Sequence, residues 1–168
     1  MELMPDLEWN LVVLHIRDLV FAFILALPIG WDREKNERTA GLRTFPLVAV
    51  AACGYMLVGM NVLNTTDDES RVMQGLIAGI GFIGGGAIVK NEVKGGGYVS
   101  GTATAASLWL TGAIGISVAT GRLEIALVLS ALTFFTLRLL TPVKALLPKE
   151  NDHATNQNSQ SEPEQNKQ

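Results

Sequence analysis

Five long apolar segments dominate the sequence and constrain its fold more than any other feature. They lie at residues 11–30, 45–63, 72–89, 102–119 and 123–140. A helix that crosses the hydrocarbon core of a bilayer needs about 20 mostly apolar residues, and each segment is apolar around its circumference rather than along one stripe. The sequence therefore predicts an all-α integral membrane protein, a bundle of five transmembrane helices within residues 11–141.

Basic residues in the short loops predict the orientation of these helices, because Lys and Arg are retained on the cytoplasmic side. The loops after the first and third segments hold Arg33, Lys35, Arg38, Arg43, Lys90 and Lys94. The loops after the second and fourth segments hold one arginine each. This pattern places a short N-terminus, residues 1–10, outside the cell. Residues 142–168 form a polar cytoplasmic tail that is predicted to be disordered.

Composition excludes several other classes of protein. The chain has 168 residues, a formal net charge of −3 and one cysteine, Cys53. Nucleic-acid binders normally carry a basic face, so no nucleic-acid partner is expected. A single cysteine excludes an intrachain disulfide and a cysteine zinc site. Because no nucleophile–base pair or cofactor motif is present, we expect no enzyme, no catalytic residue and no bound cofactor.

Small residues recur at every fourth position in three segments, the spacing at which membrane helices pack closely. We interpret the following as helix-packing or partner-binding residues: Gly75, Gly79, Gly81 and Gly85 in the third segment, and Ser107, Thr111 and Gly115 in the fourth. In the first segment Asp18 shares such a stripe with Ala22, Ala26 and Gly30, which predicts that Asp18 faces the bundle rather than lipid.

An intramembrane carboxylate is costly to bury and is a functional-site candidate, so Asp18 is the candidate metal residue. Two interpretations stay open. Asp18 is a structural partner for a neighbour such as Arg17 or His15, or it takes part in the passage of an ion. The acidic group Asp67, Asp68 and Glu69 is instead expected to lie at the start of a helix.

The segment 79–84 matches G-x-G-x-x-G, but it lies inside an apolar span and lacks the strand and the downstream acid of a dinucleotide site. Close helix packing is favoured over a broken helix whose carbonyl groups line a cavity.

In the first loop, Glu34 and Arg38 are spaced i, i+4, which predicts that the first helix continues past the membrane. Gly41 then ends the helical pattern, and Thr44 is predicted to cap the second helix.

Three motifs in order resemble those of the MgtC/SapB family. The first is 30–34 with 40–44, which includes Asp32, Arg33, Glu34, Gly41, Arg43 and Thr44. The second is the glycine-rich run 79–86, and the third is 101–109, which includes Gly101, Thr104 and Trp109. The family usually has Glu at the position of Asp32, and Thr102 and Ala103 also depart from its pattern. A polar tail where better-known members carry a soluble domain predicts a short form.

The resemblance implies a multi-pass protein of the bacterial inner membrane that is connected with magnesium limitation. Members are often labelled magnesium transporters, whereas the best-known ones are regarded as virulence-associated regulators that act on other membrane complexes, including the F-type ATP synthase. Two hypotheses follow. The chain is a regulator that binds helices of another integral membrane protein or of a second copy, or it is a cation transporter that uses Asp18. Mg²⁺ enters only as a transported or sensed ion.

Overall fold

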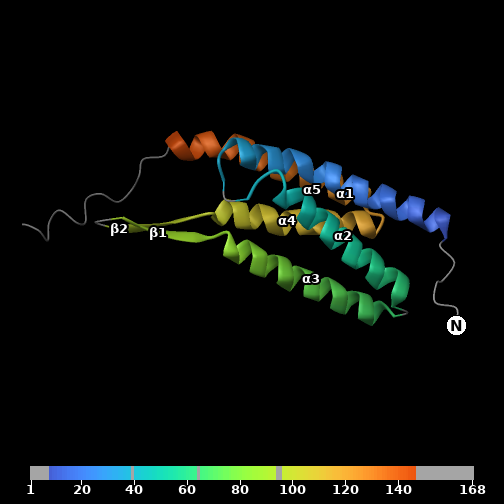
Figure 1. The fold of residues 1–168 in the computed structure, drawn as a ribbon. Helices are drawn as coiled ribbons and strands as arrows, with labels where there is room; N and C mark the ends of the chain where they lie inside the picture. The colour runs from blue at the N-terminus through green and yellow to red at the C-terminus, as the bar shows by residue number, and fades with distance from the viewer. Residues whose placement is uncertain (1–7, 39, 64, 94–95, 147–168) are drawn as a thin grey trace, which may run out of the picture.

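In the computed structural model, five helices run along roughly one direction and a β-hairpin projects from one end (Figure 1). The structure describes residues 8–38, 40–63, 65–93 and 96–146. In chain order the elements are α1 (Trp9–Lys35), α2 (Thr44–Val62), α3 (Thr66–Gly86), β1 (Val89–Val93), β2 (Gly96–Ser100), α4 (Thr102–Ala119) and α5 (Leu123–Leu146). We call the end where α2 and α4 begin the hairpin end.

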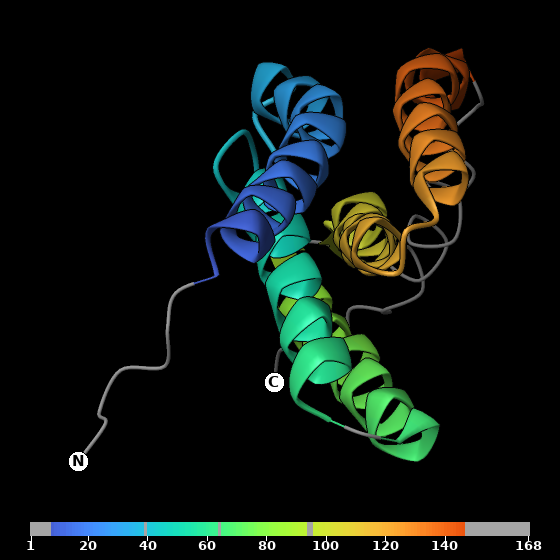
Figure 2. The same cartoon turned by 90° about the vertical axis from the view of Figure 1, so that its right-hand side faces the viewer.

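Helix α4 is the centre of the bundle, because it packs against each of the other four helices (Figure 2). Its side chains are small enough for this close contact. Ser107 and Thr111 are buried and donate their hydroxyl hydrogen bonds to carbonyl oxygens one turn earlier, at 2.5 and 2.8 Å. At Gly115 a methyl group would overlap the carbonyl oxygen of Ala49 in α2. The predicted stripe Ser107, Thr111 and Gly115 therefore lies inside the bundle.

Four of the five helices in the described part of the chain are long and apolar enough to cross a membrane, namely α1, α2, α4 and the segment Leu123–Leu140 of α5. Helix α3 does not qualify, so the prediction of five spans is supported for four. Its first turns carry Asp67, Asp68, Glu69 and Arg71. The apolar remainder, 72–86, is about 22 Å long at the helical rise, which is shorter than a hydrocarbon core of about 30 Å.

The β-hairpin was not predicted, so the all-α fold class holds for the bundle but not for residues 89–100. Strands β1 and β2 are antiparallel, and their register runs from Val89 opposite Ser100 to Val93 opposite Gly96. At the base of the hairpin, the Asn91 amide donates to the Ser100 hydroxyl at 2.9 Å. Helix α3 ends at Gly86, three residues before the predicted end of the third span, and the hairpin begins at the last residue of that span, Val89.

The helix ends differ from the prediction in three places. Helix α1 does continue past residue 30, but it ends at Lys35, so Glu34 and Arg38 form no helical pair. Thr44 is the first residue of α2 rather than its cap, and the Thr44 amide donates instead to the Gly41 carbonyl at 3.1 Å. Helix α5 continues to Leu146. The rest of the predicted tail, 147–168, and residues 1–7 lie outside the described residues.

Candidate functional site

Segments 30–34 and 40–44 meet at the hairpin end and form a compact turn, which we call the signature corner. The Glu34 carboxylate accepts a hydrogen bond from the backbone amide of Leu42 at 3.0 Å. A methyl group at Gly41 would overlap that same carboxylate, and a Cβ at Gly30 would lie only 3.1 Å from the Cα of Leu42. The backbone of the loop therefore lies tightly against Gly30 at the end of α1, and the Glu34 carboxylate occupies the space where a side chain at Gly41 would lie.

Asp32 and Arg33 form a buried ion pair inside the signature corner. The Arg33 Nη2 atom lies 2.6 Å from Oδ2 of Asp32, and the two side chains are 3% and 2% exposed, respectively. Moving two charges out of water is costly unless they neutralise each other. The Asp32 carbonyl also accepts a 2.6 Å hydrogen bond from the Asn36 side chain, which closes the end of α1. The pair thus neutralises two buried charges at the end of α1.

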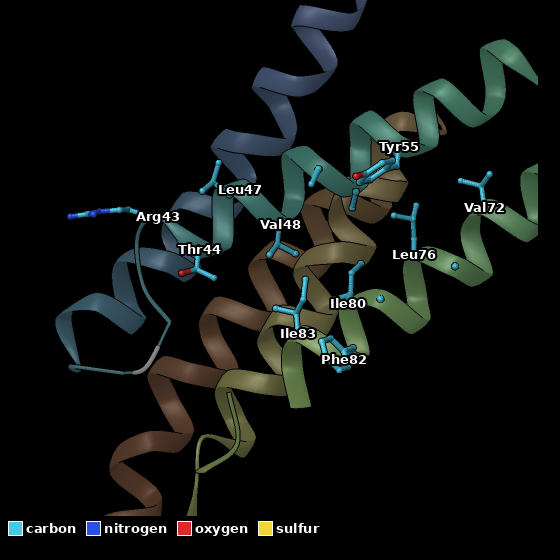
Figure 3. A pocket seen from close by; sticks show the side chains of 14 residues that line it. Arg43, Thr44, Leu47, Val48, Tyr55, Val72, Leu76, Ile80, Phe82 and Ile83 are labelled. Carbon is cyan, nitrogen blue, oxygen red and sulfur yellow. The ribbon is translucent and has the colours of Figure 1, made fainter. Parts of the chain in front are cut away.

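Arg43 lies at the other side of the signature corner, and its side chain is exposed. Among the residues that the structure describes, it forms no ion pair. Arg43 and Thr44 lie at one end of a groove between α2 and α3 (Figure 3).

The groove has a volume of about 820 Å³. Leu47, Ala51 and Tyr55 line its α2 wall, and Gly75, Gly79 and Ile83 line its α3 wall. The lining is almost entirely apolar, so the groove offers shape and hydrophobic contact rather than reactive groups.

The other two motifs meet at the base of the hairpin. A Cβ at Gly84 would lie 3.2 Å from the carbonyl oxygen of Ala105 in α4. Gly101 has a φ of 88°, and a methyl group there would overlap the carbonyl oxygen of Ala87. Thr104 is buried beside this junction, whereas Trp109 is 52% exposed. The glycine-rich run and the start of α4 therefore form one tight joint.

Gly75, Gly79, Gly81 and Gly85 do not bring helices of this chain together, because a Cβ at any of them would meet nothing within 4 Å. The repeat spacing identified a face of α3 but not what lies against it. Gly75 and Gly79 face the groove, whereas Gly81 and Gly85 lie on the other side of the helix at about 100° per residue. Partner binding through these glycines stays a prediction.

Sequence reasoning missed two glycines that do pack. Gly84 lies against α4, and a methyl group at Gly112 would overlap the side chain of Ile80. Ile80 and Gly84 are the buried residues of α3. They are four apart, which is also the spacing within the pairs Gly75–Gly79 and Gly81–Gly85. The two open stripes hold an isoleucine as well, Ile83 after Gly79 and Ile77 before Gly81, so the sequence carried no signal that separated the packed face from the open ones.

Asp18 lies on the stripe that the sequence predicted, and its side chain is 15% exposed. Ala22 and Ala26 on the same stripe are fully buried. The carboxylate forms an ion pair with its neighbour Arg17 at 2.8 Å. Among the described residues, no group of three or more His, Cys, Asp or Glu side chains is placed to hold a metal ion. Asp18 is thus a carboxylate that the adjacent guanidinium already neutralises.

Comparisons with known proteins agree on one family. The MgtC family model matches residues 19–146. Protein SrpB from Synechococcus elongatus is 36% identical over 137 residues, which cover 76% of this chain and 74% of SrpB. Protein MgtC from Salmonella typhimurium is 35% identical over 120 residues, or 71% of this chain and 49% of that protein.

Protein MgtC from Brucella abortus is 35% identical over 129 residues, or 77% of this chain and 52% of that protein. The chain thus spans about half the length of these two MgtC proteins. No solved structure matches it.

Proposed function

The chain belongs to the MgtC family, and we propose that it is an inner-membrane protein connected with magnesium limitation that regulates other membrane complexes by binding their helices. The proposal includes no enzymatic reaction. It places the signature corner and the basic loop on the cytoplasmic side, as the distribution of Lys and Arg favours. The partner is an integral membrane protein or a second copy of the chain.

The observation that supports this proposal is the open glycine face of α3. Gly81 and Gly85 are exposed, and a Cβ at either would meet no atom within 4 Å. Ala78 is exposed on the same side of the helix, so three small residues line one face. Membrane helices associate where such residues let their backbones approach. Helix α3 also lies at the edge of the bundle, where a further helix can reach it (Figure 2).

The test is to capture partners with Gly81→Leu and Gly85→Leu variants of the tagged protein after crosslinking in cells. Because leucine side chains hold two backbones apart, we expect both variants to insert normally and to lose the proteins that the wild type captures. Ala131→Leu is the matched control, since it enlarges an exposed small residue on α5. Unchanged capture by both glycine variants would remove the support for this face.

The same experiment distinguishes the two kinds of partner. If the partner is a second copy, two differently tagged chains co-purify from one cell and the glycine variants separate them. If the partner is another membrane protein, it is captured without the second tag. Either result is compatible with the proposed use of Gly81 and Gly85. The result decides whether the partner is a second copy of the chain or another membrane protein.

Magnesium transport is the second candidate function, and the position of Asp18 supports it. The carboxylate lies within the apolar length of α1 and is mostly buried. Two facts weigh against it. Arg17 already pairs with Asp18 at 2.8 Å, and Mg²⁺ demands an octahedral shell of oxygen ligands and loses water reluctantly.

Flux into proteoliposomes separates transport from regulation. Saturable Mg²⁺ uptake by the wild type that Asp18→Asn abolishes and Glu124→Gln leaves intact would establish transport through Asp18. Glu124 is a suitable control because its side chain is 66% exposed at the start of α5. Uptake no greater than that of empty liposomes, with correct insertion, is the result we expect.

A further inference from the structure

The groove between α2, a candidate membrane span, and α3 is an open, apolar surface (Figure 3). Helices α2 and α3 contact closely near the end opposite the hairpin, where a Cβ at Gly59 would lie 3.2 Å from the Val72 side chain. Towards the hairpin end the two helices separate, and Gly75 and Gly79 add no side chain to an α3 wall that is otherwise formed by apolar residues such as Leu76 and Ile83. In a bilayer this space must be filled by an apolar group, because water finds no hydrogen-bond partners there.

The depth of the groove corresponds to one leaflet of the bilayer. From Thr44 to Tyr55 the α2 wall rises about 16 Å at the helical rise. Half of the hydrocarbon core measures about 15 Å. A transmembrane helix of a partner would continue across both leaflets, whereas a lipid acyl chain ends near the middle of the bilayer. The dimensions of the groove therefore fit an acyl chain better than a helix.

The mouth of the groove is cationic. Arg43 and Thr44 lie at the hairpin end of the groove, which the predicted orientation places towards the headgroups of the cytoplasmic leaflet. Arg43 is exposed and forms no ion pair in the described part of the chain. No acidic side chain is among the described residues that line the groove. A guanidinium without a protein partner is suited to a phosphate group.

We propose that the groove binds an acyl chain of an anionic phospholipid from the leaflet at the hairpin end, with the lipid phosphate against Arg43. The hydrophobic walls of α2 and α3 provide the contact for the chain, and Arg43 selects lipids with a net negative charge. This site is independent of the proposed partner face, because Gly81 and Gly85 do not line the groove. Failure of one proposal therefore leaves the other intact.

The test measures lipid that the purified protein retains in detergent. The protein is incubated with equimolar phosphatidylglycerol and phosphatidylethanolamine that carry the same acyl chains, and bound lipid is identified by native mass spectrometry. We expect the wild type to retain phosphatidylglycerol preferentially. Arg43→Gln is expected to lower this preference about fivefold, the contribution of one basic residue near an anionic lipid surface. Arg38→Gln, which removes an exposed charge away from the groove, is the matched control.

A second pair of variants tests the groove itself. Gly79→Leu places a large side chain on the α3 wall and is expected to abolish retention of both lipids, whereas Gly81→Leu adds the same side chain on the other face and keeps it. Ala51→Leu narrows the groove from the α2 side and is expected to abolish retention as well, so the test does not depend on Gly79→Leu alone. The helical circular dichroism of both variants is compared with that of the wild type to confirm that they fold.

Three results would overturn the proposal. The first is a wild type that retains no phosphatidylglycerol, and the second is an Arg43→Gln variant that keeps the full preference. The third is a Gly79→Leu variant that retains lipid normally but changes from an oligomer to a monomer. That last result would assign the groove to a second copy of the chain.

Discussion

At the scale of single residues, the ion pair of Asp32 and Arg33 is the most consequential interaction of the signature corner. Both side chains are almost completely buried. Replacing Arg33 by Met leaves the Asp32 charge uncompensated, and we expect a loss of about 3–5 kcal/mol in the free energy of unfolding. The double variant Asp32→Leu with Arg33→Met removes both charges and is expected to recover most of that loss.

Thermal unfolding in detergent measures both effects, and Arg38→Met is the control because Arg38 is exposed. A single variant at Arg33 as stable as the wild type would show that the buried pair does not contribute to the free energy of unfolding. The sequence identified both residues through the family motif. It did not reveal that they are buried, because adjacent charges after an apolar segment normally lie in water.

Gly101 provides a second prediction at this scale. Its φ is 88°, and a methyl group would overlap the carbonyl oxygen of Ala87. Gly121 has a φ of 72° with open space around it, so it is the matched control. We expect Gly121→Ala to cost about 1–2 kcal/mol from backbone strain alone, and Gly101→Ala to cost clearly more. Equal shifts in melting temperature would show that the joint between α3 and α4 is looser than the structure indicates.

At the scale of the helices, two glycines in neighbouring elements behave in opposite ways. Gly115 in α4 lies against the backbone of α2, whereas Gly75 in α3 faces open space. Replacing Gly115 by Ala should lower the melting temperature, because α2 and α4 must separate to accommodate the methyl group. Replacing Gly75 by Ala should raise it slightly, since alanine is favoured over glycine within a helix by about 0.5–1 kcal/mol. If both variants unfold like the wild type, α4 is not tightly packed.

The same two helices show how much of the fold and the site was predictable. Hydropathy located all five helices, because a long run of apolar residues can be recognised in the sequence without knowledge of which helices it packs against. The repeat of small residues was present in both α3 and α4, yet it lies in a helix interface only in α4. Spacing defines a face, but the neighbour of that face depends on how the helices pair. The hairpin was missed because its strands contain Lys90, Asn91, Glu92, Gly96 and Gly97, residue types that are depleted in strands and typical of a loop.

At the scale of the whole molecule, the short apolar length of α3 bears on topology. The predicted orientation places the loop before α3 outside the cell and the hairpin in the cytoplasm. Single cysteines at Thr65 and Tyr98, in a Cys53→Ser background, test this with a membrane-impermeant maleimide. Both positions lie outside the helices, and Tyr98 is exposed.

We expect labelling of Thr65→Cys in intact spheroplasts and labelling of Tyr98→Cys only after lysis. The Cys53→Ser parent is the unlabelled control, and its cysteine is buried in α2. Labelling of both positions from the same side would mean that α3 does not cross the membrane. The bundle would then have the four spans that length and hydropathy alone support.

The central position of α4 also sets a constraint on biogenesis. The ribosome releases α1, α2 and α3 before it has made the helix against which all of them pack. Helices α1 and α2 are apolar enough to remain in the lipid on their own, but α3 carries four charged residues within its first six and has a short apolar length. We therefore expect α3 to remain beside the translocon until α4 emerges. The two helices would then enter the bilayer as a pair that the hairpin connects.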